Sequence, residues 1–129
     1  MIAILLLLAA PAAAQTAPPP SVVRFGEGRG AGVLGRIVVD TAGEQIGRIV
    51  DVLVDPDGRP LAAVVDVGGF LGVGTRRVAV VWETLHFLRV DGAMRISEDL
   101  TMDEVAAAPE YRGADGPVDA LGPRPAPAR

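Results

Sequence analysis

Two stretches of the sequence contain the residue types of a nucleotide-binding site. Asp40 and Gly43 in DTAGEQ have the Asp-x-x-Gly spacing with which small GTPases sense a γ-phosphate, and GGFLGVGT at 68–75 is rich in glycine. A phosphate-binding loop also needs a Lys, and it must lead from a strand into a helix. The sequence contains no Lys, and RRVAVVW after the loop is typical of a strand. This context excludes a nucleotide switch.

The same residues fit a role as chain turns. Asp is favoured at the first position of a type I turn, where its carboxylate accepts nearby backbone N–H groups, and Gly is favoured at the fourth. Asp40 and Gly43 have this spacing, and Asp55 and Gly58 repeat it fifteen residues later in DPDG. We therefore predict two consecutive hairpins with equivalent turns. The hydrophobic alternation slips around Gly47, which predicts a bulge or bend there.

Carboxylates at Asp55, Asp57 and Asp66 raise the question of a calcium site. An EF-hand loop needs an oxygen ligand at its fifth position, a Gly at its sixth, and flanking helices. Arg59 and Pro60 occupy those two positions, and the flanking segments have the pattern of strands. An EF-hand is excluded, while a weak divalent-cation site at the Asp55/Asp57 turn stays open as an alternative.

The remaining residues offer little for catalysis. His86 is the single histidine and Cys is absent, so a zinc ligand set and thiol chemistry are lacking. A Ser/His/Asp triad would need a nucleophile elbow, which neither Ser21 nor Ser97 has. We interpret His86 as a half-exposed strand residue between Leu85 and Phe87. We therefore expect no catalytic residues, no metal, no cofactor and no enzymatic activity.

The glycine-rich loop at 68–74 carries two large apolar side chains, Phe70 and Leu71. Two alternatives remain open: the pair plugs one end of the fold, or it stays exposed and docks a partner. Arg76 and Arg77 follow the loop and are suited to bidentate hydrogen bonds with an acidic partner. The loop's N–H groups together with these two arginines form an alternative site for a small ligand or ion.

Short β-strands must position these residues. Runs rich in Val and Ile, separated by turn residues, are typical of a small all-β sandwich or barrel. After the last run, Thr101 and Glu104 have the spacing of a capping box, and Pro109 ends a short helix. The predicted fold is mainly β, a small barrel of about six short antiparallel strands with one short C-terminal helix. The residues expected to dock the helix on the barrel are Leu100, Val105 and Ala108.

Composition divides the 129 residues into segments. An apolar run at 2–10 precedes small residues with Ala-x-Ala spacing, which is typical of a signal peptide cleaved near Ala14 and Gln15. We expect a periplasmic or secreted protein without stable membrane insertion after cleavage. The predicted organisation is a signal peptide at 1–14, a flexible leader at 15–32, the barrel domain at 33–111 and a disordered tail at 112–129.

Charge narrows the class of partner. The formal net charge is −4, all basic residues are Arg, and charges of both signs alternate along the chain. There is no basic stripe of the kind that binds nucleic acid. We therefore expect a protein partner or self-association, and no nucleic acid.

The order of these motifs resembles the PRC-barrel family, and above all its stand-alone bacterial members. The resemblance covers residues 33–111 and rests on Leu34 and Gly35 before the first strand, G-x-x-I-G at 43–47, DPDG, GGFLGVG and a closing AAPEY. Val81 departs from it, since such proteins tend to have Pro before the aromatic residue. The resemblance implies a six-stranded or similar barrel that binds other proteins, with no catalytic residues to carry over.

The leading functional hypothesis is a non-enzymatic periplasmic module for protein interaction or structure. The specific roles of the reaction-centre H subunit and of ribosome-maturation factors, which contain related barrels, are not transferred. The alternative is a barrel that binds a small ligand or ion, through the loop at 68–74 with Arg76 and Arg77 or through the Asp55/Asp57 turn.

Overall fold

The computed structural model describes residues 4–68 and 76–128 and divides the chain into two units, 1–30 and 31–129. In the first unit the described residues form no helix or strand, and their side chains are exposed. No helix in the described part of the chain is both long and apolar enough to cross a membrane. All regular structure lies in the second unit. The predicted sites at Phe70 and Leu71 lie outside the described residues.

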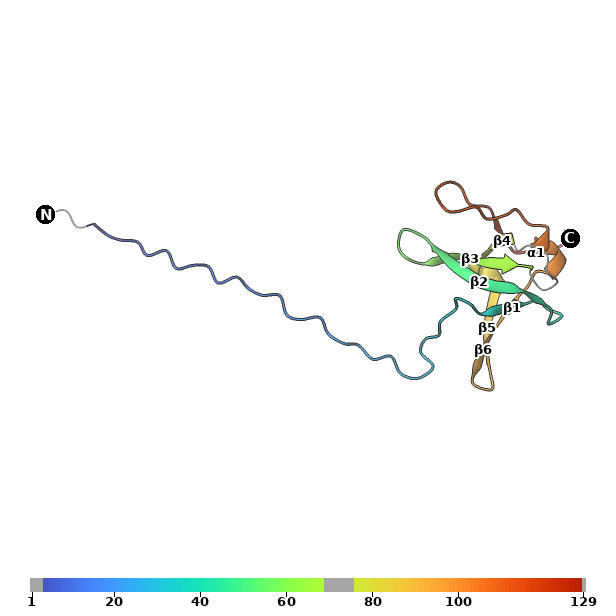
Figure 1. The fold of residues 1–129 in the computed structure, drawn as a ribbon, viewed down its shortest axis with the longest axis horizontal. Helices are drawn as coiled ribbons and strands as arrows, with labels where there is room; N and C mark the ends of the chain where they lie inside the picture. Colours follow the sequence, from blue (N-terminus) through green and yellow to red (C-terminus); the bar gives the residue numbers. More distant parts are fainter. Residues whose placement is uncertain (1–3, 69–75, 129) are drawn as a thin grey trace. The chain divides into compact units, whose positions relative to one another are not determined.

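Seven strands form one curled sheet in the order β5-β6-β1-β2-β3-β4-β7 (Figure 1). A 3₁₀ turn, η1 (Trp82–Thr84), connects β4 to β5, and helix α1 (Met102–Ala106) follows β6. This architecture confirms the predicted mainly β, barrel-type fold with one short helix near the C-terminus. The strands are β1 (Ile37–Val39), β2 (Gln45–Val54), β3 (Pro60–Val67), β4 (Arg76–Val81), β5 (Leu85–Val90), β6 (Ala93–Glu98) and β7 (Ala120–Leu121).

The pairing differs in two places from the predicted antiparallel barrel. β1 pairs parallel with β6, and β4 pairs parallel with β7, whereas the other neighbouring strands are antiparallel. The β1–β6 contact joins the β5–β6 hairpin to the β1–β4 meander. β7 lies in the segment 112–129, for which the sequence predicts disorder. It pairs there because the edge of β4 offers unpaired backbone groups that a passing segment can satisfy.

The first two hairpins have the same turn. The Gly43 N–H donates to the Asp40 carbonyl at 3.0 Å, and the Gly58 N–H donates to the Asp55 carbonyl at 2.9 Å. In each turn the aspartate Oδ1 accepts two further backbone N–H groups at 2.9 Å. Both glycines have positive φ, +84° at Gly43 and +82° at Gly58, which favours Gly over other residues. The two Asp-x-x-Gly stretches therefore form the corners of hairpins.

Gly47 lies where the backbone of β2 comes closest to β3. A Cβ at this position would lie 2.1 Å from the carbonyl oxygen of Asp66. The register between β1 and β2 shifts next to it, which leaves Ile46 as the extra residue of a bulge. Ile46 and Gly47 are both buried although they are consecutive. The slip in alternation thus reflects a bulge beside a close backbone contact.

The core is aliphatic and lies inside the curled sheet, with α1 packed against it. The helix begins with a capping box, in which the Thr101 hydroxyl accepts the Glu104 N–H and the Glu104 carboxylate accepts the Thr101 N–H. The helix spans five residues, so capping and docking have to hold it in place. The buried cluster comprises Val38, Ile46, Ile49, Ala63, Val65, Val67, Val78, Val80, Leu85, Ile96, Leu100, Val105 and Ala108.

Candidate functional site

The two arginines predicted to bind a partner have different surroundings. The guanidinium of Arg76 donates to the carbonyls of Ala106 and Ala108, both at 2.6 Å. It therefore caps the C-terminal end of α1, where orphan carbonyls and the helix dipole favour a cation. Arg77 is exposed on β4, opposite Asp66 of β3. Of the two, Arg77 has the more exposed side chain.

In the Asp55/Asp57 turn, the carboxylate of Asp55 is already hydrogen-bonded to the backbone of the turn. Asp55 Oδ1 accepts the N–H groups of Asp57 and Arg59, both at 2.9 Å. In the described ranges, 4–68 and 76–128, no group of three or more His, Asp or Glu side chains is arranged to hold a metal ion. The carboxylate of Asp55 thus acts as a turn acceptor.

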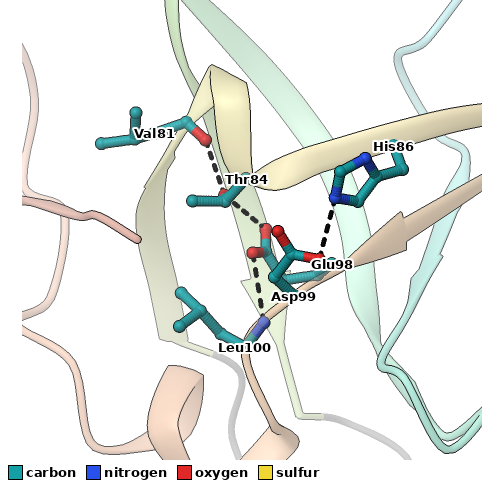
Figure 2. A network of polar contacts seen from close by, with 6 residues as sticks. All are labelled: Val81, Thr84, His86, Glu98, Asp99 and Leu100. Atoms are coloured by element: carbon teal, nitrogen blue, oxygen red, sulfur yellow. Dashed lines mark hydrogen bonds and ion pairs between the residues drawn. The ribbon is translucent and has the colours of Figure 1, made fainter. Parts of the chain in front are cut away.

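A buried acidic side chain, which the sequence analysis missed, lies at the end of β6 (Figure 2). Glu98 is 1% exposed. Thr84 Oγ1 lies 2.9 Å from Glu98 Oε2 and 2.7 Å from the Val81 carbonyl oxygen, and the Leu100 N–H donates to Glu98 Oε1 at 3.4 Å. The alternation of Met94, Ile96 and Glu98 along β6 was a signal for this burial.

The surroundings of Glu98 raise its pKa toward neutral pH. Burial raises its pKa to about 7, and the charge of Asp99 adds to the rise, against hydrogen bonds from Thr84 and Leu100 that lower it. The Thr84 hydroxyl has one proton but two oxygens within reach. A protonated Glu98 resolves this, because it donates to Thr84 Oγ1 while Thr84 donates to the Val81 carbonyl. Each acceptor in this network then has one donor.

His86 and Asp99 form an exposed pair near this network (Figure 2). His86 Nε2 lies 2.8 Å from Asp99 Oδ1, and the two side chains are 51% and 55% exposed. Ser97 lies directly opposite His86 across β5 and β6. Exposed ion pairs contribute little to stability. The sequence interpretation of His86 as a half-exposed strand residue agrees with this position.

A groove of about 550 Å³, called here the arginine groove, lies beside β1. Its apolar floor on the outer face of the sheet is formed by Ile37 and Val39, which are half-buried. Three arginines from separate elements surround the floor, and within residues 4–68 and 76–128 no carboxylate lines it. The lining residues are Gly35, Arg36, Ile37, Val39, Gln45, Arg48, Met94, Arg95 and Ile96.

Strand register places Arg48 and Arg95 on either side of Ile37. Arg48 of β2 is directly opposite Ile37. On the other side, β6 runs parallel to β1 with Val38 aligned to Ile96, so Arg95 comes next to Ile37. Neighbouring strands lie about 4.8 Å apart, which separates the backbones of the two arginines by about 10 Å. Both side chains therefore border the same strip of apolar surface.

Backbone carbonyls hold two of the three guanidinium groups in place. Arg36 Nε donates to the Gly32 carbonyl at 2.6 Å, and Arg48 Nη1 donates to the Gly35 carbonyl at 2.9 Å. A guanidinium has five N–H donors, so each retains donors for a ligand. None of the ion pairs in the described part of the chain involves Arg36, Arg48 or Arg95. The groove thus has an ordered cationic rim.

No motif in the sequence predicts the arginine groove. Arg36, Arg48 and Arg95 are widely separated along the chain, and each looks like an ordinary exposed strand or turn residue. Only the parallel pairing of β1 with β6 brings Arg95 beside the other two. The sequence carries no local signal for that pairing.

The edge strand β5 continues the same surface. β5 ends the sheet order, so its outer edge has no strand partner among the residues that the structure describes. Leu88 is 58% exposed and lies directly opposite Arg95, and Val90, on the same face of β5, is 38% exposed. The β5–β6 hairpin extends away from β2 and β3 (Figure 1). An unpaired edge and exposed apolar side chains are features of protein-binding surfaces.

A second groove, of about 410 Å³, lies between the β2–β3 hairpin and the C-terminal segment. It is mainly apolar and is lined by Leu53, Val54, Leu61, Ala62, Val81, Glu83, Ala114, Val118 and Ala120. The chain's own C-terminal segment, which is held by the pairing of β7 with β4, forms one wall of this groove. The chain itself therefore closes the groove on that side.

Comparison with known proteins agrees with the resemblance found in the sequence. The family model described as PRC-barrel domain matches residues 26–104, which is more than half of the chain. No curated protein matches the chain.

Proposed function

Because the chain belongs to the PRC-barrel domain family, we propose that it is a non-enzymatic module that binds a protein partner. The binding surface is the outer face of β5, β6, β1 and β2. The observation that carries the proposal is the continuity of exposed Leu88 with Arg95 and the arginine groove. The signal-peptide pattern at 2–14 supports the further proposal that the module works in the periplasm of a bacterium.

The free edge of β5 supports this assignment. Edge strands present unpaired N–H and C=O groups, and proteins usually protect them with Pro, Lys, bulges or covering segments. β5 contains no Pro and only one arginine, Arg89, and it pairs with β6 in regular register from Leu85 to Val90, without a bulge. Such an edge is suited to accept a strand from another chain.

Co-purification from envelope extracts of the native host tests the proposal, with the full chain carrying an affinity tag. Leu88→Gln removes apolar surface next to the arginine groove. Leu61→Gln is the matched control, because Leu61 is 52% exposed against 58% for Leu88 and lies on β3. We expect Leu88→Gln to reduce the amount of captured partner and Leu61→Gln to leave it unchanged. Equal capture by the wild type and both variants would contradict the proposal.

A barrel that binds a small anion is the second candidate function. The arginine groove is the specific observation that favours it, in place of the loop at 68–74 or the Asp55/Asp57 turn. A thermal-shift screen with phosphate, nucleotides and divalent ions separates the two functions, since a ligand that binds the native state raises the melting temperature. A protein-binding module predicts no shift with any of these compounds at saturating concentration.

A further inference from the structure

We infer that the arginine groove binds an extended acidic segment of the protein partner. Arg36, Arg48 and Arg95 would hold carboxylates of that segment, and Ile37 and Val39 would contact its backbone and aliphatic carbons. This inference names the class of partner and therefore rests on the proposed function.

The distribution of charge favours an acidic ligand. The chain has 16 acidic and 12 basic side chains, yet no carboxylate is among the residues that line the groove. The nearest acidic residue in register is Asp66, directly opposite Arg48 on β3, and no ion pair joins the two. A cationic concavity on an acidic protein attracts anionic segments locally and discriminates against partners of the wrong charge.

The geometry fits an extended chain. The backbones of Arg48 and Arg95 are about 10 Å apart, which is about the length of three residues of extended chain at 3.3 Å per residue. In an extended chain, side chains two residues apart, about 6.6 Å, point to the same side, and the long Arg and Glu side chains can cover the remaining distance to both guanidinium groups. Anchoring of Arg36 and Arg48 by the Gly32 and Gly35 carbonyls reduces the ordering cost of binding.

The groove is less suited to nucleic acid. Proteins that bind single strands stack bases on aromatic side chains along a continuous basic track. The floor of the arginine groove is aliphatic, and no aromatic residue among those that the structure describes lines it. Guanidinium groups match the planar, bidentate geometry of carboxylates. The carboxylates of an acidic peptide can therefore bind the arginines of the rim, while its aliphatic carbons contact the floor.

Fluorescence anisotropy with a labelled oligoglutamate peptide and the full chain tests the inference. We expect saturable binding that weakens as salt concentration rises. Since exposed ion pairs are worth up to about 1 kcal/mol, each of Arg36→Gln, Arg48→Gln and Arg95→Gln should raise Kd about fivefold, and the triple variant about a hundredfold. Arg59→Gln, in the exposed β2–β3 turn, is the matched control and should bind like the wild type.

Arg95 provides the second variant that keeps the test independent of folding. Arg95→Glu reverses the charge at this position and should abolish binding of the peptide. The far-UV circular dichroism spectrum and the melting temperature of this variant should stay those of the wild type. Arg95→Lys should bind with intermediate affinity, because it keeps the charge but loses the bidentate geometry.

Four outcomes would overturn the inference. The first two are a lack of oligoglutamate binding at low salt and an equal loss of affinity in Arg59→Gln. The other two are tighter binding to anionic lipid vesicles than to the peptide, and a dimer, detected by light scattering, that Arg48→Gln dissociates. If the peptide fails to bind while Leu88→Gln still reduces partner capture, this inference fails and the proposed function stands.

Discussion

The hydroxyl of Thr84 lies 2.9 Å from the carboxyl group of Glu98, and both side chains are buried beside an aliphatic core. One hydroxyl proton serves the Glu98 carboxyl and the Val81 carbonyl only when Glu98 is itself protonated. We therefore expect the stability of the fold to depend on the protonation of Glu98.

Replacing Glu98 with Gln should remove a pH dependence of stability. Burial raises the pKa of Glu98 from its ordinary value of 4.5 to about 7 in the folded chain, so the native state binds a proton that the unfolded state releases between these values. The free energy of unfolding of the wild type should therefore fall as pH rises through this window, by up to about 3 kcal/mol. Urea denaturation at several pH values measures it.

The isosteric Glu98→Gln variant should show a flatter profile. Its amide can donate to Thr84 Oγ1 as the protonated carboxyl does, so the variant should equal the wild type at the acid end and exceed its stability above neutral pH. Thr84→Val, which deletes the hydroxyl, serves as the comparison and should destabilise at every pH. A Glu98→Gln variant that is less stable than the wild type in alkaline buffer would show that the carboxylate is the native form.

Two glycine substitutions should differ in cost. Gly47→Ala forces a Cβ to within 2.1 Å of the Asp66 carbonyl oxygen, so β2 and β3 must separate. Overpacking of this kind costs about 1–3 kcal/mol, or more where backbone is involved. Gly43→Ala has open space and pays only for its positive φ, about 1–2 kcal/mol. Chemical denaturation should rank Gly47→Ala as the less stable variant, and the reverse order would contradict the close approach at β2.

The guanidinium of Arg76 should contribute to stability, whereas that of Arg77 should not. Arg76→Met leaves the carbonyls of Ala106 and Ala108 without their donors and should cost about 1–3 kcal/mol. Arg77→Met is the matched control at an exposed position of the same strand, with an expected change within about 0.5 kcal/mol. Thermal unfolding compares the two. Equal effects would mean that the contact with α1 contributes nothing.

Local features of this fold could be predicted from sequence because their causes are local. Asp40 and Gly43 specify a turn through their own side-chain acceptor and positive φ, and Thr101 and Glu104 cap a helix with bonds three residues apart. The bulge beside Gly47 could also be predicted from the sequence, since it breaks the alternation of apolar residues in β2. In each case the signal and the structure lie within one turn or strand.

The candidate site could not be predicted in the same way. Arg95 borders the groove only because β6 lies parallel to β1, and that pairing is set by how the β5–β6 hairpin closes the core. Glu98 shares the inner face of β6 with Ile96, but its charge favoured exposure, and only the enclosing structure makes the neutral form preferable. β7 is too short to have a pattern of its own.

Chemical-shift mapping by NMR tests the central claim most directly, because it locates the binding surface without any substitution. The isotope-labelled chain would be titrated with the acidic peptide or with a partner obtained by co-purification. We predict that the largest amide shifts fall on Ile37, Val39, Arg48 and Arg95, and spread to Leu88 along the edge of β5. Shifts concentrated at the β2–β3 turn or along the groove beside the C-terminal segment would contradict it.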